Sequence, residues 1–186
     1  MFSHTPMFIQ IRDDEGIYSI DREDLIKYSG RAGLIASGVV MRLLTEAFKD
    51  LTPHEVPHRD SIRILSAFPG QGVRDGIEFI TRAVTQNRFI LDMNAGNELA
   101  AISPIGGQMY FEVAIGDQAM AYSYSSKVFN QRWQYEVLKK QTGSIDYQTH
   151  ADYMSYKYGF LGRLLSDENV FAEKKVISTE RFKMLM

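Results

Sequence analysis

The sequence predicts a single α+β domain in which an antiparallel or mixed sheet packs against helices and which forms a homodimer. Short apolar runs rich in β-branched residues are typical of strands, and longer stretches carry apolar residues at helical spacing. At 186 residues the chain is most simply one domain, large enough to bury a sizeable core. We expect residues 1–165 to form this core with a helical extension, and residues 166–186 to form a C-terminal arm that docks on the body or on a partner subunit.

Composition and charge argue against several classes of protein. The net charge is −2 with acids and bases interspersed, so the sequence shows no electrostatic footprint for nucleic acid. There are no cysteines, which excludes disulfides, thiolate nucleophiles and cysteine-ligated metals. No apolar run reaches the roughly 18 to 20 residues of a membrane-spanning helix, and the N-terminus lacks the pattern of a signal peptide. We expect a cytoplasmic protein that binds neither nucleic acid nor membrane.

The first third of the chain predicts a hairpin followed by two helices. Strands are expected at 7–11 and 17–20, joined by a turn. Asp21, with Asp24 three residues later, is a good N-cap for the first helix. This helix pauses at 28–33, and a second helix with a broad apolar face follows. It spans 34–50, and its small residues at 36–38 predict that another backbone packs closely against it.

The rest of the chain is organised around the stretch 61–84, SIRILSAFPGQGVRDGIEFITRAV. An apolar strand ends at Pro69, a turn follows at Gly70–Gly72, and a helix begins after the turn. Gly159 and Gly162 allow breaks in the last helix. The remaining expected elements are strands at 87–92, 99–102, 109–115 and 119–124, and helices at 128–141 and 147–165.

The glycine turn before the helix at 73–84 is the candidate binding site. A strand that feeds such a turn leaves backbone N–H groups free at the start of the helix, where the helix dipole also favours an anion. The same turn is equally compatible with a purely structural role, because glycine turns join strands to helices in many proteins for steric reasons.

Two stretches together resemble one family. The first is Tyr28-Ser29-Gly30-Arg31-Ala32-Gly33, continuing to Gly38 and Arg42. The second is Gly72-Val73-Arg74-Asp75-Gly76-Ile77-Glu78, with Asn87-Arg88-Phe89-Ile90 leading into the next strand. In spacing and apolar pattern they resemble the core domain of the FmdE-like family, which is named after a component of formylmethanofuran dehydrogenase, over roughly residues 24–115. The resemblance implies an α+β core that dimerises and a role in one-carbon or cofactor metabolism.

The chain departs from that family at its metal-binding and reactive positions. Two histidines and a cysteine of the family are replaced here by Ser29, Arg31 and Gly72. A hydroxyl, a guanidinium and bare backbone are poor ligands for a soft metal, so we expect no metal and no cofactor at this site. Arg31, together with the N–H groups near Gly70–Gly72, suits a carboxylate or phosphate instead.

We therefore expect a polar, anion-accepting cleft between the turns at 29–33 and 70–75 that binds a small anionic or heteroaromatic ligand, with or without metal-independent catalysis. Arg31 and Asp75 are the candidates for a catalytic role. In the alternative interpretation these two residues form an ion pair at a helix end, and the protein is a non-catalytic subunit or scaffold in a larger assembly. The predicted ligand-binding residues are Ser29, Gly30, Arg31, Gly70, Gln71, Gly72, Arg74 and Asp75.

Two further patterns favour ordinary structural roles. His54 and His58 have an i, i+4 spacing, but Pro57 removes the helix that a zinc site of this kind requires, so a solvated loop is the better interpretation. Several aromatic residues in the second half either line a pocket for a flat ligand or, as is more common, form core or interface. They are Tyr110, Phe111, Tyr122, Tyr124, Tyr135, Tyr147 and Tyr153.

Overall fold

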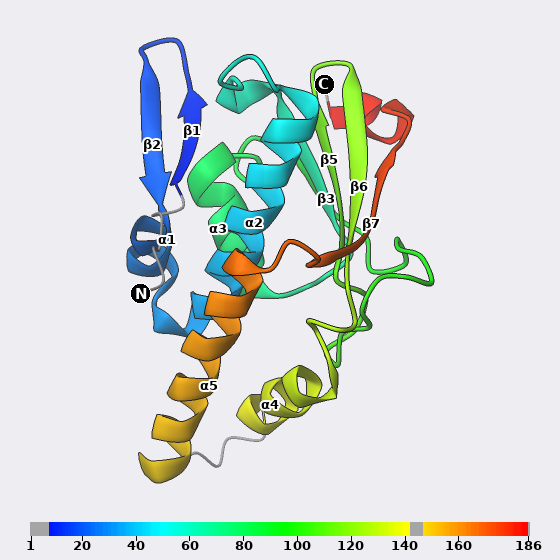
Figure 1. Cartoon of the computed structure of the whole chain (residues 1–186). Helices are drawn as coiled ribbons and strands as arrows, with labels where there is room; N and C mark the ends of the chain where they lie inside the picture. The colour runs from blue at the N-terminus through cyan, green and yellow to red at the C-terminus, as the bar shows by residue number, and fades with distance from the viewer. Residues whose placement is uncertain (1–7, 142–146, 186) are drawn as a thin grey trace.

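The computed structural model describes residues 8–141 and 147–185, and it confirms a single α+β domain. A five-stranded sheet carries helices on one face, and a two-stranded hairpin lies beyond those helices (Figure 1). The α-helices and strands are β1 (Phe8–Arg12), β2 (Ile17–Asp21), α1 (Arg22–Ser29), α2 (Leu34–Leu51), β3 (Ile62–Ser66), α3 (Gln71–Thr81), β4 (Phe89–Leu91), β5 (Tyr110–Ile115), β6 (Gln118–Tyr124), α4 (Gln131–Gln141), α5 (Tyr147–Ser166) and β7 (Phe171–Val176).

The large sheet is mixed, with the strand order β4-β3-β5-β6-β7. Only the pair β3–β4 is parallel, with Ile64 opposite Phe89; β5, β6 and β7 each run antiparallel to their neighbours. Helix α3 connects the two parallel strands, as a crossover connection must. The strand, turn and helix predicted for 61–84 are thus present, although the helix ends three residues early, at Thr81.

The N-terminal hairpin and its exit into α1 follow the local sequence signals. Strand β1 pairs with β2, and Asp21 at the end of β2 caps α1 by accepting a hydrogen bond from the backbone N–H of Asp24. The Asp24 side chain accepts from the Asp21 N–H in return, which completes a capping box. Helix α1 ends at Gly30, whose φ of 73° is accessible to glycine at little strain. A short 3₁₀ turn, Arg31–Gly33, then leads into α2.

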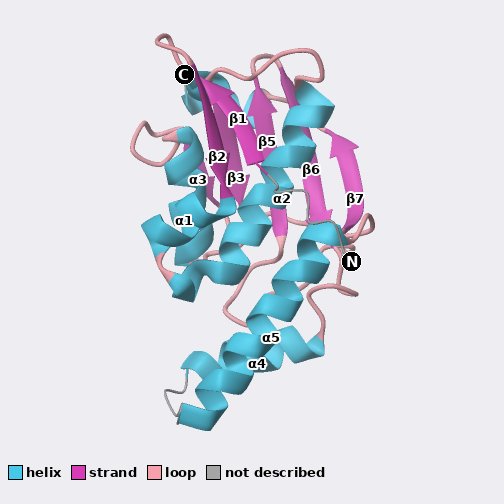
Figure 2. Ribbon diagram, turned by 60° about the vertical axis from the view of Figure 1, so that its left-hand side comes forward, coloured by secondary structure: helices cyan, strands magenta, loops and turns pink. Residues whose placement is uncertain are grey.

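Helix α2 lies at the centre of the molecule. It packs against α1, α3, α5, the hairpin and the inner face of the sheet (Figures 1 and 2). The small residues predicted to allow close approach do so: a Cβ atom built on Gly38 would lie 2.4 Å from Leu161 Cδ1 of α5. The buried residues of α2 are Leu34, Ser37, Gly38, Val39, Val40, Met41, Leu43, Leu44, Ala47 and Leu51.

Residues 166–185 complete the sheet and cover its second face. Strand β7 pairs with β6, and the short 3₁₀ helix Glu180–Leu185 buries Phe182 against the face that turns away from α2. Arg181 adds an ion pair to the buried Glu112 on β5, with Nη1 and Oε1 3.0 Å apart. The expected C-terminal arm therefore docks on the body of its own chain (Figure 1).

Two local predictions are wrong. Residues 99–102 make only isolated bridges, at Ala100 and Ile102, because the chain there belongs to a long loop that folds back on itself. Helix α5 is continuous from Tyr147 to Ser166, so neither glycine breaks it. The packing of Phe160, Leu161 and Leu164 in the core holds that part of the helix in place. No described helix is both long enough and apolar enough to cross a membrane.

Gly72→Ala is expected to destabilise the fold. The added Cβ would lie 2.9 Å from Ala36 Cβ and 3.3 Å from Gly33 Cα, so the start of α3 must move away from the start of α2. We expect a loss of about 1 to 3 kcal/mol in the free energy of unfolding, measured by urea denaturation. Gly162→Ala is the matched control, because nothing lies within 4 Å of its Cβ and alanine favours a helix. Equal stability of the two variants would contradict this close contact.

Candidate functional site

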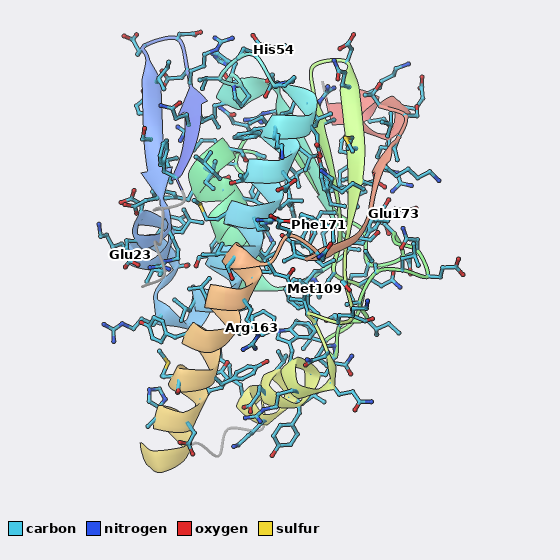
Figure 3. All side chains as sticks on the ribbon, viewed as in Figure 1. Glu23, His54, Met109, Arg163, Phe171 and Glu173 are labelled. Carbon is cyan, nitrogen blue, oxygen red and sulfur yellow. The ribbon has the colours of Figure 1, made fainter. Side chains whose placement is uncertain are left out.

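A cavity of about 400 Å³ lies where the start of α2, the start of α3, α4 and α5 meet the end of the large sheet. In Figure 3 the labelled Met109, which lines the cavity, lies at the end of the sheet nearest α4. The lining residues are Ser29, Ala32, Gly33, Ile35, Ala36, Val39, Phe68, Gly70, Gln71, Gly72, Val73, Asp75, Ile105, Met109, Phe129, Trp133, Val137, Lys140, Tyr153 and Lys157.

This one cavity is bordered by two glycine-containing turns that the sequence analysis singled out, at 28–33 and at Gly70–Gly72. They touch each other directly, since a Cβ atom on Gly72 would lie 3.3 Å from Gly33 Cα. The chain between them forms α2, a loop and β3, and the packing of α3 on α2 brings the two turns together. The predicted site residues that line the cavity are Ser29, Gly70, Gln71, Gly72 and Asp75.

The other three predicted residues, Gly30, Arg31 and Arg74, are not among those that line the cavity. The side chains of Arg31 and Arg74 are exposed. Within the described part of the chain, Asp75 Oδ1 accepts a hydrogen bond from Gln71 Nε2 at 2.6 Å, and no ion pair joins Asp75 to Arg31. Arg31 contributes to this site through its backbone carbonyl, not through its guanidinium.

Lys157 of α5 is the candidate site residue that the sequence reasoning missed. It lines the cavity and is only 2% exposed. Its Nζ donates hydrogen bonds to the carbonyl oxygens of Arg31 at 2.5 Å and Ala32 at 3.4 Å, and lies 5.2 Å from the centre of the Tyr153 ring. A signal was present in the sequence: Lys157 shares a helical face with Phe160, Leu161 and Leu164, and a lysine among core residues is unusual.

Within residues 8–141 and 147–185 the charge of Lys157 is not balanced by a carboxylate. Among the described residues no Asp or Glu side chain forms an ion pair with it. Burial, followed by the nearby positive charge of Lys140, lowers the pKa of Lys157 from 10.5 to about 8. Near neutral pH the cavity therefore holds an ammonium group that costs free energy to bury and that an incoming anion would stabilise.

The start of α3 offers a second group of donors to the same cavity. Gly70 is the N-cap and provides no side-chain hydrogen bond. The N–H groups of Val73 and Arg74 both donate back to the Gly70 carbonyl, at 3.1 and 3.3 Å. Gln71 and Gly72 are the first two residues of α3, and their N–H groups have no acceptor within the helix. The positive end of the α3 dipole is thus directed toward the wall that Gly70–Gly72 forms.

The remaining wall is apolar and largely aromatic. Phe129 and Trp133 meet edge to face with ring centres 4.9 Å apart, and Phe68 lies 6.3 Å from Trp133. Of the aromatic residues considered from the sequence, Tyr153 lines the cavity. Tyr135 is exposed, and the side chain of Tyr147 lies outside the described part of the structure. The others, Tyr110, Phe111, Tyr122 and Tyr124, belong to the core.

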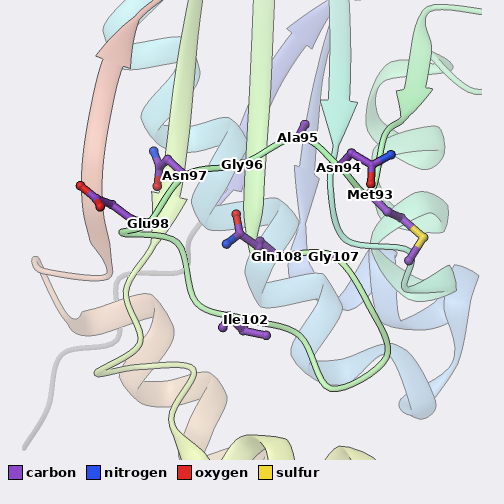
Figure 4. Close-up of a pocket in the computed structure, with 9 residues that line it drawn as sticks. All are labelled: Met93, Asn94, Ala95, Gly96, Asn97, Glu98, Ile102, Gly107 and Gln108. Atoms are coloured by element: carbon purple, nitrogen blue, oxygen red, sulfur yellow. The ribbon is translucent and has the colours of Figure 1, made fainter.

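A second hollow, of about 470 Å³, lies against the loop 93–108 and is more open to solvent (Figure 4). The loop crosses the strands from Met93 to Asn97 and returns through Ile102 to Gln108. The amide of Asn97 is already bonded, because it donates to Ser123 Oγ and to Glu173 Oε2, each at 2.9 Å. We therefore place the functional site in the cavity that contains Lys157.

The histidine pair in the loop after α2 does not form a metal cluster in the described residues. His58 Nε2 lies 3.1 Å from Asp14 Oδ1, and its other ring nitrogen accepts from the Asp60 N–H at 3.2 Å. No group of three or more histidine, aspartate or glutamate side chains in residues 8–141 and 147–185 is placed to hold a metal ion. In comparisons with known proteins, the chain matches no protein-family model and no curated sequence.

The pKa of Lys157 predicts how stability depends on pH. Because the pKa is about 8 in the folded protein and 10.5 in the free side chain, the unfolded chain binds more protons between these values, and stability rises with pH through this interval. From pH 7 to 9 the wild type should gain about 1 kcal/mol in unfolding free energy relative to Lys157→Met. Urea denaturation of both proteins at each pH measures this difference.

The comparison with Lys157→Met isolates this one group. Tyr110, Tyr122 and Tyr156, whose pKa values are raised by burial, are present in both proteins, so their contributions cancel. A difference in stability that stays constant from pH 7 to 9 would show that Lys157 is not perturbed.

Proposed function

We propose that the protein binds a small organic anion with a flat or apolar body in the cavity between the two glycine turns. The observation that carries this proposal is Lys157, an ammonium group buried in the wall of the cavity with no carboxylate partner in the described residues. A bound carboxylate or phosphate supplies the missing negative charge. The charge-assisted hydrogen bond between this anion and the ammonium group also offsets part of the free energy that burial of the lysine costs.

Different walls of the cavity contact different parts of such a ligand. The N–H groups of Gln71 and Gly72 and the dipole of α3 hold the anion, and Lys157 balances its charge. Phe68, Phe129 and Trp133 cover the apolar body. A volume of about 400 Å³ is in the usual range for a small-molecule site, and a mostly apolar lining with a few polar groups is typical.

The relation to the FmdE-like family is part of the same proposal. Its support is positional: the stretches 28–33 and 72–78, which carry the resemblance, both border the cavity. In this proposal the ligand belongs to one-carbon or cofactor metabolism, and any reaction proceeds without a metal at Ser29, Arg31 and Gly72. Asp75, which lies in the second stretch, and Lys157, which contacts the first, supply titratable groups for such a reaction.

The proposal predicts that anion binding depends on Lys157. We use 4-methylbenzoate as the probe and 4-methylbenzamide, its neutral isostere, as the control ligand, with affinities measured by calorimetry at pH 7. The wild type should bind the benzoate and discriminate against the amide. Lys157→Met should lower the affinity for the benzoate roughly ten- to a hundredfold, since a charge-assisted hydrogen bond contributes about 1.5 to 3 kcal/mol.

Lys49→Met is the matched control variant, because Lys49 is an exposed lysine near the far end of α2 and its loss changes the net charge equally. It should bind 4-methylbenzoate as the wild type does. Phenyl phosphate, tested in parallel, distinguishes a phosphate site from a carboxylate site. Failure of the wild type to bind either anion would contradict the proposed function.

The homodimer is a separate prediction. It rests on the apolar and aromatic residues in the late helices and the tail, yet several of these are buried within the chain itself: Phe160, Leu161, Leu164, Val170 and Phe182. Others are exposed, among them Tyr135, Leu138, Tyr158 and Val176, and they provide the surface for a second copy. Light scattering at micromolar concentration measures the mass, and a mass of one chain would contradict the prediction.

A further inference from the structure

We infer that the Lys157 amine is a nucleophile that forms an imine with an aldehyde carried by an aromatic anion in the cavity. This inference rests on the proposed function, because the same cavity must first hold the anion. It extends that function by naming the reactive group of the ligand and the atom of the protein that it meets.

Two backbone carbonyls fix the orientation of the amine. Lys157 Nζ donates to the carbonyl oxygens of Arg31 and Ala32, which accounts for two of its hydrogens. Among the described residues no other hydrogen bond is made by Nζ, and Lys157 lines the cavity, so we assign the third position on nitrogen to the cavity. When the ammonium group loses a proton while keeping both hydrogen bonds, the lone pair occupies this position. In this inference the two carbonyls hold the nitrogen so that its lone pair meets the ligand.

The surroundings of the amine raise the fraction of its neutral form above that of an exposed lysine, although the ammonium form still predominates at pH 7. An apolar, buried environment and a neighbouring positive charge disfavour the ammonium group, and desolvation of a lysine in this way is a recognised means of making it nucleophilic. Three other titratable groups line the same cavity: Lys140 on α4, Asp75 on α3 and Tyr153 on α5. Of these, Lys140 disfavours the ammonium form of Lys157. Asp75 accepts a hydrogen bond from Gln71.

The amine and the anion-binding N–H groups are on neighbouring walls of the cavity. The carbonyls that hold Lys157 belong to Arg31 and Ala32, and the next residue, Gly33, touches Gly72 at the start of α3. A ligand with its anion and its aldehyde on opposite edges of one aromatic ring therefore contacts both walls, while its ring faces the aromatic side chains of the third wall.

The reaction needs no oxidant or reductant. The lone pair of Nζ attacks the aldehyde carbon and forms a C–N bond, and the carbonyl oxygen takes up a proton that the nitrogen gives up. The hydroxyl group of the resulting carbinolamine takes up a proton and leaves as water, while the nitrogen electron pair forms the C=N bond and the nitrogen gives up its second proton. One aldehyde and one amine thus yield one imine and one water.

The test uses 4-carboxybenzaldehyde with sodium cyanoborohydride, which reduces the imine to a stable secondary amine. Intact mass measurement of the full chain should show one adduct, and peptide mapping should place it on Lys157. At pH 7.5 labelling of Lys157 should be roughly tenfold faster, or more, than labelling of the exposed Lys49, because far more of its amine is unprotonated. Lys157→Met should lose the adduct, and Lys49→Met should keep it.

Addition of 4-methylbenzoate, which has no aldehyde, separates this inference from the proposed function. Suppression of the Lys157 adduct by the benzoate supports both. Binding of the benzoate without an adduct, or an adduct that persists in Lys157→Met, overturns the imine and leaves the proposed function standing. An adduct on Lys157 that the benzoate does not suppress, together with no measurable benzoate binding, supports the nucleophile and overturns anion recognition. Neither binding nor adduct overturns both.

Discussion

The burial of helix α2 is the constraint on which the rest of the structure depends. A helix covered on most sides needs neighbours that approach closely, and glycines at two of its contacts allow this: Gly38 accommodates Leu161 of α5, and Val40 fills the space beside Gly76 of α3. These contacts bring the start of α3 and the middle of α5 to the same end of α2. The cavity is the space left where these ends meet the large sheet.

The same packing buries the ammonium group of Lys157, which has no carboxylate partner among the described residues. Along α5 the core-facing positions are taken by Phe160, Leu161 and Leu164, and Lys157 continues that face toward the cavity. Two backbone carbonyls accept two of its three hydrogens, but carbonyl dipoles do not replace a carboxylate. The buried charge lowers stability near neutral pH, and in the proposed function the same charge attracts the anion. In that proposal, stability and ligand binding place opposite demands on one residue.

Local signals in the sequence predicted local structure well. Three features illustrate this: the capping box at Asp21, the hairpin before it, and the strand, turn and helix of 61–84. Each depends on residues within a few positions of each other, so it can be predicted from the sequence. Local signals gave wrong predictions where contacts between residues far apart in the sequence determine the structure. The glycines of α5 lie in an unbroken helix because neighbouring residues are held in the core, and the cations that line the cavity are Lys140 and Lys157 instead of Arg31.

The sequence by itself determined the fold class, most strands and helices, and the two glycine turns that border the cavity. Each of these follows from periodicity or from the backbone freedom of glycine, which are properties of short segments. Only the tertiary structure decided which side chains reach the cavity. Arg31 and Lys157 are far apart in the sequence, and the packing of α5 on α2 brings the Lys157 amine to the Arg31 carbonyl and leaves the Arg31 side chain exposed. That outcome depends on long-range contacts that no local pattern encodes.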